Sequence, residues 1–77
     1  MNFEIFWAPA ALHAFYRLPM HSAALVDRAV IRFADSGEGQ LDWDPPYHLL
    51  RAGFYDLVLV MNRANSSVTV LRIYRAR

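Results

Sequence analysis

Four side chains in the second half of the chain could bind a phosphate group or another anion. Three of them are the arginines Arg51, Arg72 and Arg75, and the fourth is Tyr74. A guanidinium group is planar and can donate paired hydrogen bonds to phosphate or carboxylate oxygens, while a phenol can donate or accept a hydrogen bond. If the fold brings them together, these four side chains could surround one phosphate.

The charged residues are unevenly distributed, although the formal net charge is only +1. Six of the seven acidic residues lie before residue 45, and five of the eight basic residues lie after it, together with a single acid, Asp56. Every basic residue is an arginine. The second half could therefore face an anion or an acidic partner, or it could simply carry its solvated surface charge as arginine.

The sequence offers no pattern for a metal or a cofactor. It has no cysteine, and its three histidines match no metal-ligand spacing. Asp42 and Asp44 lie two residues apart but lack a third ligand. Residues 37–39, Gly-Glu-Gly, lack the lysine and the strand-to-helix context of a phosphate-binding loop. We therefore expect a protein without a cofactor or a metal.

The apolar periodicity predicts two helices and four strands. A strand alternates over residues 2–7, a proline then opens the first helix, and the second helix ends near Gly37. The expected ranges are strand 2–7, helix 9–17, a second helix from the His21-Ser22 cap to residue 35, an extended loop 37–46, and strands 47–51, 54–61 and 68–75. This β-α-α-β-β-β order predicts one α+β domain over residues 1–77, in which a helical hairpin covers one face of an antiparallel sheet.

Side-chain alternation divides the predicted sheet into a core face and an open face. The row predicted to lie in the core comprises Tyr55, Leu57, Leu59, Met61, Leu71 and Ile73. The row predicted to lie on the open face comprises Phe54, Asp56, Val58, Val60, Val70, Arg72 and Tyr74. We expect Asp56 and Arg72 to form an ion pair across the strands.

The predicted open face is mostly apolar and allows two interpretations. It could be a second core face that the loop around Leu41 and Trp43 covers, or it could bind a partner helix or a second copy of the chain. A chain of 77 residues, of which 56% are hydrophobic, has difficulty burying all of them, and this favours the second interpretation. The predicted partner-binding residues are Phe54, Asp56, Val58, Val60 and Val70.

Four segments of the chain resemble the RelE/ParE superfamily of bacterial toxins from type II toxin–antitoxin pairs. They are a strand and proline-started helix at residues 5–12, an amphipathic helix ending near glycine at 29–37, Leu-Arg-Ala-Gly-Phe-Tyr-Asp at 50–56, and Val-Thr-Val-Leu-Arg-Ile at 68–73. The third segment is similar to the Leu-Arg-x-Gly-x-Tyr-Arg turn and strand of the family. The resemblance implies that the chain shares the fold of this superfamily.

The resemblance also implies partners and an activity. It suggests an antitoxin protein as a partner, a role in plasmid stabilisation, and a target such as ribosome-bound messenger RNA or DNA gyrase. Metal-independent RNA cleavage needs a base, a cation and an acid. In this chain Arg51, Arg72 and Arg75 could supply the cation, and Tyr74 could supply the acid or the base.

The chain departs from the family where this chemistry would be carried out. Asp56 stands where the family usually has arginine, and it inverts the charge expected near the scissile phosphate. His48 and Leu49 stand where basic residues often precede the Leu-Arg pair. Three residues follow Tyr74, whereas the resembled family has a longer basic and aromatic segment at this place. The resemblance therefore supports the fold better than it supports a ribonuclease activity.

Three functions remain open at this point. The first is a toxin that acts by binding a cellular target and is neutralised by an antitoxin. The second is a ribosome-dependent messenger RNA endonuclease with a reduced Arg/Tyr site, and the third is a non-toxic homodimeric binding module that retains only the fold. The lack of an apolar run near about 20 residues and of a basic amino terminus predicts a cytoplasmic protein without membrane contact.

Overall fold

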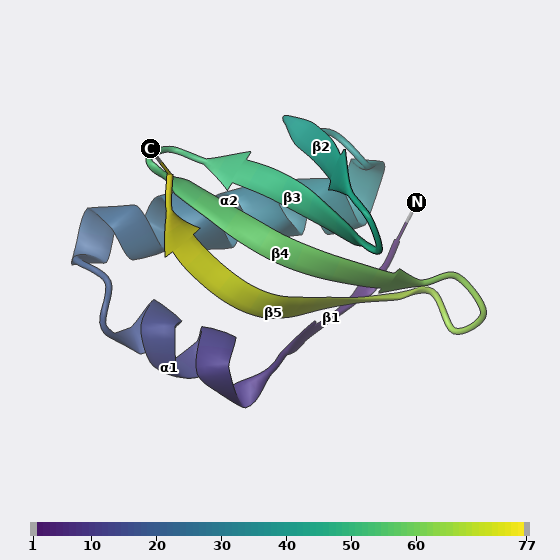
Figure 1. The fold of residues 1–77 in the computed structure, drawn as a ribbon, viewed down its shortest axis with the longest axis horizontal. Helices are drawn as coiled ribbons and strands as arrows, with labels where there is room; N and C mark the ends of the chain where they lie inside the picture. Colours follow the sequence, from purple (N-terminus) through teal and green to yellow (C-terminus); the bar gives the residue numbers. More distant parts are fainter. Residues whose placement is uncertain (1, 77) are drawn as a thin grey trace.

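The chain folds into a strand, a helical hairpin and four further strands, and the computed structural model describes residues 2–76 (Figure 1). The elements are β1 (Glu4–Trp7), α1 (Pro9–Tyr16), α2 (Met20–Ser36), β2 (Leu41–Asp44), β3 (Tyr47–Ala52), β4 (Tyr55–Asn62) and β5 (Ser67–Arg75). The predicted α+β class and the predicted order of elements are confirmed, with one additional strand, β2.

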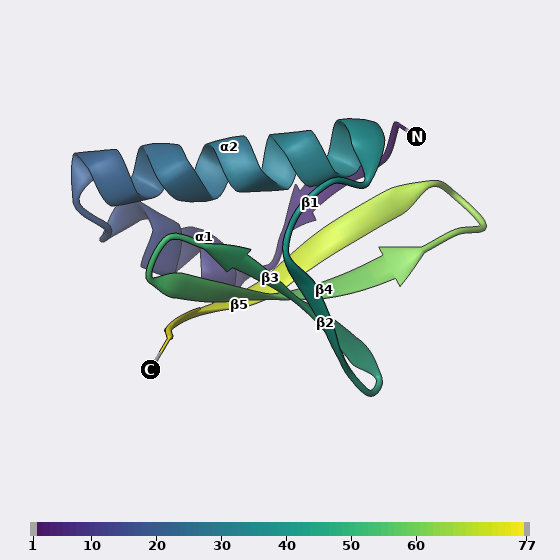
Figure 2. The same ribbon diagram turned by 90° about the horizontal axis from the view of Figure 1, so that it is seen from above.

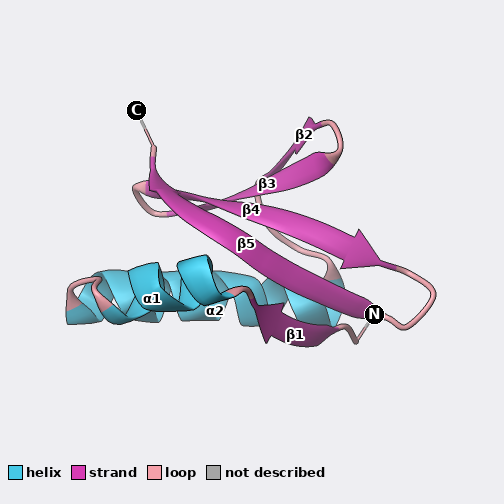
Figure 3. Ribbon diagram, turned by 60° about the horizontal axis from the view of Figure 1, so that its bottom comes forward, coloured by secondary structure: helices cyan, strands magenta, loops and turns pink. Residues whose placement is uncertain are grey.

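The five strands form one sheet in the order β1-β5-β4-β3-β2. The last four strands make an antiparallel meander, and β1 runs parallel to β5, with Ile5 opposite Val68. Both helices lie on one side of this sheet (Figure 3). A parallel pair needs a crossover connection, and the helical hairpin between β1 and the meander supplies it.

The prediction of an extended loop over residues 37–46 is wrong for residues 41–44, which form β2. In this segment two apolar residues alternate with two aspartates, and the strand pairs antiparallel with β3. Leu41 lies opposite Leu50 and packs against the core, whereas the ring of Trp43 lies 4.6 Å from that of His48. The hairpin of β2 and β3 extends the sheet and points away from α2 at its turn (Figure 2). The segment that could have covered the open face is therefore an edge strand.

Helix α2 supplies most of the cover on the core face. Its buried side chains recur at helical spacing, and Val26, Val30 and Phe33 pack in one cluster with Leu50 and other residues of the sheet. Helix α1 is short and contributes the buried Ala11 together with partly buried neighbours. No helix in the described part of the chain is long and apolar enough to cross a membrane.

A β-bulge in β5 changes which of its side chains face the core. The pairing with β4 shifts so that Val58 lies opposite Arg72 while Leu59 lies opposite Val70, which leaves Leu71 as the extra residue. An extra residue reverses the alternation of every side chain beyond it. Val70 is consequently fully buried in the core, and the predictions that Val70 lies on the open face and Leu71 in the core are wrong.

Candidate functional site

The sheet face opposite the helices carries rows of residues that lie directly across from one another. Tyr74 lies opposite Asp56 in one row, and Arg72 lies opposite Val58 in the next. Leu49 extends the second row onto β3. Residues paired in this way project from the same face of a sheet. The strands β3, β4 and β5 therefore contribute side chains to one surface that neither helix covers.

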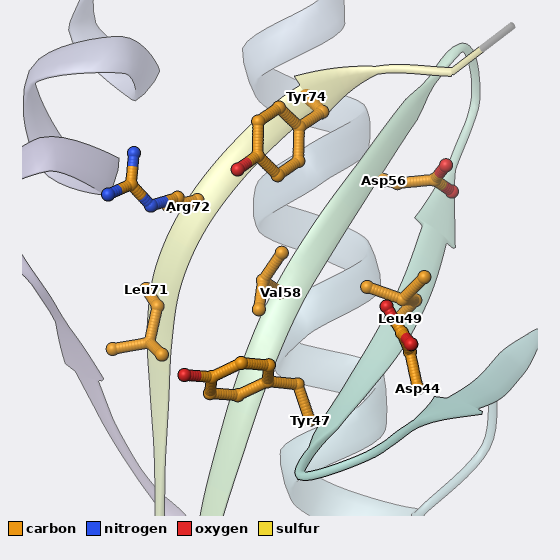
Figure 4. A pocket seen from close by; sticks show the side chains of 8 residues that line it. All are labelled: Asp44, Tyr47, Leu49, Asp56, Val58, Leu71, Arg72 and Tyr74. Atoms are coloured by element: carbon orange, nitrogen blue, oxygen red, sulfur yellow. The ribbon is translucent and has the colours of Figure 1, made fainter.

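This surface is hollowed into a cavity of about 420 Å³ (Figure 4). The floor is aliphatic and includes Val58, which is 8% exposed, and the rim carries tyrosines and charged groups. The lining residues are Asp44, Tyr47, Leu49, Asp56, Val58, Leu71, Arg72 and Tyr74. We call this hollow the sheet pocket.

The ion pair at the sheet pocket differs from the one expected from the sequence. Arg51 donates from Nε to Oδ1 of Asp56 at 2.8 Å, so the predicted pair between Asp56 and Arg72 is wrong. Arg51 on β3 lies directly opposite Asp56, whereas Arg72 lies opposite Val58, two residues further along β4. Figure 4 shows the guanidinium of Arg72 on the opposite side of the pocket from the carboxylate of Asp56.

The structure brings together two of the four candidate catalytic residues. Arg72 and Tyr74 both line the sheet pocket. Arg51 is held by Asp56 at the margin of the pocket. Arg75 lies opposite Tyr55, which packs against the core, so it projects from the helix-covered face of the sheet. A group of three arginines around one phosphate is therefore not formed.

The predicted partner-binding residues also separate into different environments. Asp56 and Val58 line the sheet pocket, and Val60 is half-buried in the next row of the same face. Phe54 precedes β4 in a turn and is 73% exposed. Val70 belongs to the core, so it is unavailable to any partner of the folded chain.

Sequence reasoning missed four residues that line the sheet pocket, Asp44, Tyr47, Leu49 and Leu71. Tyr47 and Leu49 alternate with Leu50 in a strand that was predicted, so their face could have been assigned from period-two spacing. Asp44 was missed because its strand was interpreted as a loop. Leu71 was missed because no local residue signal marks the bulge that turns it outward.

The charges of the sheet pocket suit a protein surface better than a phosphodiester. Two carboxylates, of Asp44 and Asp56, and one guanidinium, of Arg72, line the pocket, and Arg51 pairs with Asp56 at its margin. These groups together give the pocket no excess of positive charge that would attract a phosphodiester. Tyrosine and arginine around a buried apolar centre are typical of protein–protein interfaces. The residues that line the sheet pocket thus form a surface with an aliphatic floor and an amphipathic rim.

Comparisons with known proteins give matches in three-dimensional structure, whereas no protein-family model and no curated protein matches the chain. One similar structure is a chain of the RelBE2 toxin–antitoxin complex of Mycobacterium tuberculosis, with a TM-score of 0.77 and 17% identity, covering 97% of this chain and 99% of that chain. A chain of the archaeal RelE-RelB complex of Pyrococcus horikoshii has a TM-score of 0.77 and 14% identity, covering 97% of this chain and 96% of that chain.

A third similar structure is a chain of the intact RelBE toxin–antitoxin complex of E. coli. Its TM-score is 0.77 at 18% identity, and the match covers 100% of this chain and 99% of that chain. The match therefore includes the helical hairpin and every strand, although fewer than one residue in five is shared. The resemblance noted in the sequence is confirmed at the level of the fold: the chain has the fold of the RelE toxins.

Proposed function

We propose that this protein is the toxin of a bacterial toxin–antitoxin pair, acting in the cytoplasm by binding a cellular target through the sheet pocket. An antitoxin that covers the same face would neutralise it. The observation that carries this proposal is the uncovered pocket itself, with aliphatic side chains such as Leu49 and Leu71 between two tyrosines. Apolar surface of this kind on a small chain is typical of an interaction site.

The similar structures support an antitoxin as the partner. Two of the three come from toxin–antitoxin complexes, and the third comes from the archaeal RelE-RelB complex. The present chain matches those chains over nearly their whole length. A protein that keeps this fold and exposes an apolar sheet face has a surface on which such a partner could dock.

The ion pair between Arg51 and Asp56 supports binding over RNA cleavage. Arg51 lies in the Leu-Arg-x-Gly segment of the family resemblance, and here its Nε is engaged by a carboxylate at 2.8 Å. A carboxylate beside the guanidinium offsets the positive charge that a scissile phosphate requires. We therefore propose binding of a macromolecular target as the main function, in preference to RNA cleavage.

Inducible expression of the chain without an antitoxin tests the proposed toxin role. We expect growth to stop after induction, and we expect co-expression of an adjacent antitoxin gene to restore it. An empty vector and an equally expressed core variant that does not fold, such as Val70→Asp, are the controls. Unimpaired growth at equal protein levels would exclude the toxin role, and a stable homodimer in solution would then favour a non-toxic binding module.

A ribosome-dependent endonuclease is the second candidate, because Arg72 and Tyr74 line the same pocket. In that case Arg72 stabilises the developing charge on the phosphate. Tyr74 acts either as the base for the attacking 2′ hydroxyl or as the acid for the leaving oxygen. Primer extension on ribosome-bound message would show cleavage by the native chain and none by the double variant R72A/Y74F. Growth arrest that persists in the double variant, without cleavage, would leave binding as the mechanism.

A further inference from the structure

A second cleft, of about 270 Å³, lies between α2 and the turn that joins β3 to β4. Its apolar floor is formed by Leu25, Ala29 and Ala52. Gly53 in the turn has a positive φ of 61°, and a Cβ at this position would lie 3.2 Å from Cδ1 of Leu25. The turn and the helix therefore approach closely at one end of the floor. We call this feature the arginine cleft.

Three arginines surround this floor, Arg28 and Arg32 from α2 and Arg51 from β3. Arg28 and Arg32 are exposed, and none of the residues that line the cleft is acidic. Within residues 2–76 the single ion pair is that of Arg51 with Asp56, which uses Nε and leaves the terminal nitrogens of Arg51 as donors. Three cations thus converge on one cleft with one carboxylate beside them, and an anion bound there would relieve their mutual repulsion.

We propose that the arginine cleft binds an acidic peptide segment of a protein partner. Arg28 and Arg32 are separated by four residues of helix, which is a rise of about 6 Å. Carboxylates two residues apart in an extended peptide are separated by a similar distance, about 6.6 Å. Each guanidinium can hold a carboxylate through two parallel hydrogen bonds, while an apolar side chain of the same segment rests on the floor.

The lining of the cleft favours a peptide over a nucleic acid. Single-stranded nucleic acids are bound by a charged groove together with aromatic side chains on which the bases stack, and no aromatic residue lines this cleft. Proteins that track a phosphate backbone are usually strongly basic, whereas the formal net charge of this chain is +1. An apolar floor inside a cationic rim instead matches a segment in which carboxylates flank an apolar residue.

The arginine cleft is distinct from the sheet pocket, and the proposal does not depend on the toxin role. The residues that line one site do not line the other. The ion pair of Arg51 and Asp56 lies between them, since Arg51 lines the cleft and Asp56 lines the pocket. A chain without any toxin activity could therefore still bind an acidic segment at this place.

Fluorescence anisotropy with a labelled peptide, Glu-Glu-Leu-Glu-Glu, tests the proposal on the purified full chain at about 0.15 M salt, where distant charges are screened. We expect saturable binding that the R28A/R32A double variant weakens by at least about tenfold, the effect of losing one strong charge-assisted hydrogen bond. The matched control is R17A/R63A, which removes two exposed arginines elsewhere and should bind like the native chain.

Three results would overturn the proposal. The first is an absence of peptide binding by the native chain, and the second is an equal loss in R28A/R32A and R17A/R63A, which would indicate unspecific attraction. The third is tighter binding of a single-stranded RNA of equal charge, which would assign the cleft to a nucleic acid. Thermal melting followed by circular dichroism should show that both double variants are folded, since all four arginines are exposed.

Discussion

At the scale of single residues, Asp56 reduces the positive charge at the margin of the sheet pocket. It stands where the resembled family has arginine, and in the folded chain its carboxylate accepts a hydrogen bond from Arg51 at 2.8 Å. The side chains of Arg51 and Asp56 are 40% and 27% exposed, respectively. Solvent screens a pair this exposed, so its main effect is on the charge and orientation of Arg51, with little effect on the stability of the fold.

The D56N variant should therefore lower the free energy of unfolding by less than about 1 kcal/mol, as exposed ion pairs generally do. Urea denaturation of the native chain and the variant measures this difference. D42N, a change of the same kind at an exposed position of β2, is the matched control. A loss well above that of the control would show that the pair holds the β3–β4 hairpin together.

Gly53 should be far more sensitive to substitution. It has a positive φ in the turn between β3 and β4, and a Cβ there would press on Leu25 at 3.2 Å. G53A should cost about 1–2 kcal/mol from the left-handed backbone alone. G53N, which tolerates this backbone better, should cost less in the same urea titration. Equal stability of G53A and the native chain would contradict the turn as described.

At the scale of secondary-structure elements, the bulge in β5 determines which residues reach the sheet pocket. It places Val70 in the core and turns Leu71 outward to line the pocket beside Arg72. Without it, strict alternation would bring Leu71 to the helices and remove an aliphatic contact from the open face. The composition of the proposed binding surface therefore depends on one extra residue in one strand.

Substitutions on the two sides of the bulge should have opposite consequences. V70D buries an unpaired charge among core side chains and should cost roughly 3–5 kcal/mol, enough to unfold a small domain. L71D changes a half-exposed residue and should cost no more than about 1 kcal/mol. Circular dichroism melts of the two variants distinguish them. A folded V70D beside an unfolded L71D would mean that the alternation continues unbroken.

Local sequence patterns predict some elements of this chain and miss others. The apolar spacing of α2 and its end near Gly37 are predicted well, because both are local properties of the helix. The strand β2 is short and acidic, and its pairing with β3 and the packing of Leu41 against the core are contacts that its own sequence does not predict. The bulge is a shift in the register between β4 and β5, and period-two counting within one strand does not include register.

The candidate site was predicted less completely than the fold for the same reason. The sequence placed Arg72, Tyr74, Asp56 and Val58 on one face, and the structure lines one pocket with them. The partner of Asp56 was assigned to the wrong strand, because cross-strand partners depend on register and the register is set by turns and bulges. The arginine cleft joins α2 to a distant turn, and no spacing within either segment indicates it.

At the scale of the whole molecule, the two helices cover one face of the sheet and leave the other to solvent (Figure 3). The sheet pocket occupies that open face, and the arginine cleft lies at the edge where α2 meets the β3–β4 turn. The ion pair of Arg51 and Asp56 lies between the two sites, since each site is lined by one member of the pair.

Colony counts after inducible expression of L71D test the central claim, that the open sheet face is the working surface of a toxin. We expect the native chain to reduce viable counts, L71D to grow like an empty vector, and the control Y16D, which alters a side chain on α1 that is 75% exposed, to remain toxic. All three proteins must be present at equal levels and folded. Persistent toxicity of L71D, or normal growth with the native chain, would contradict the account.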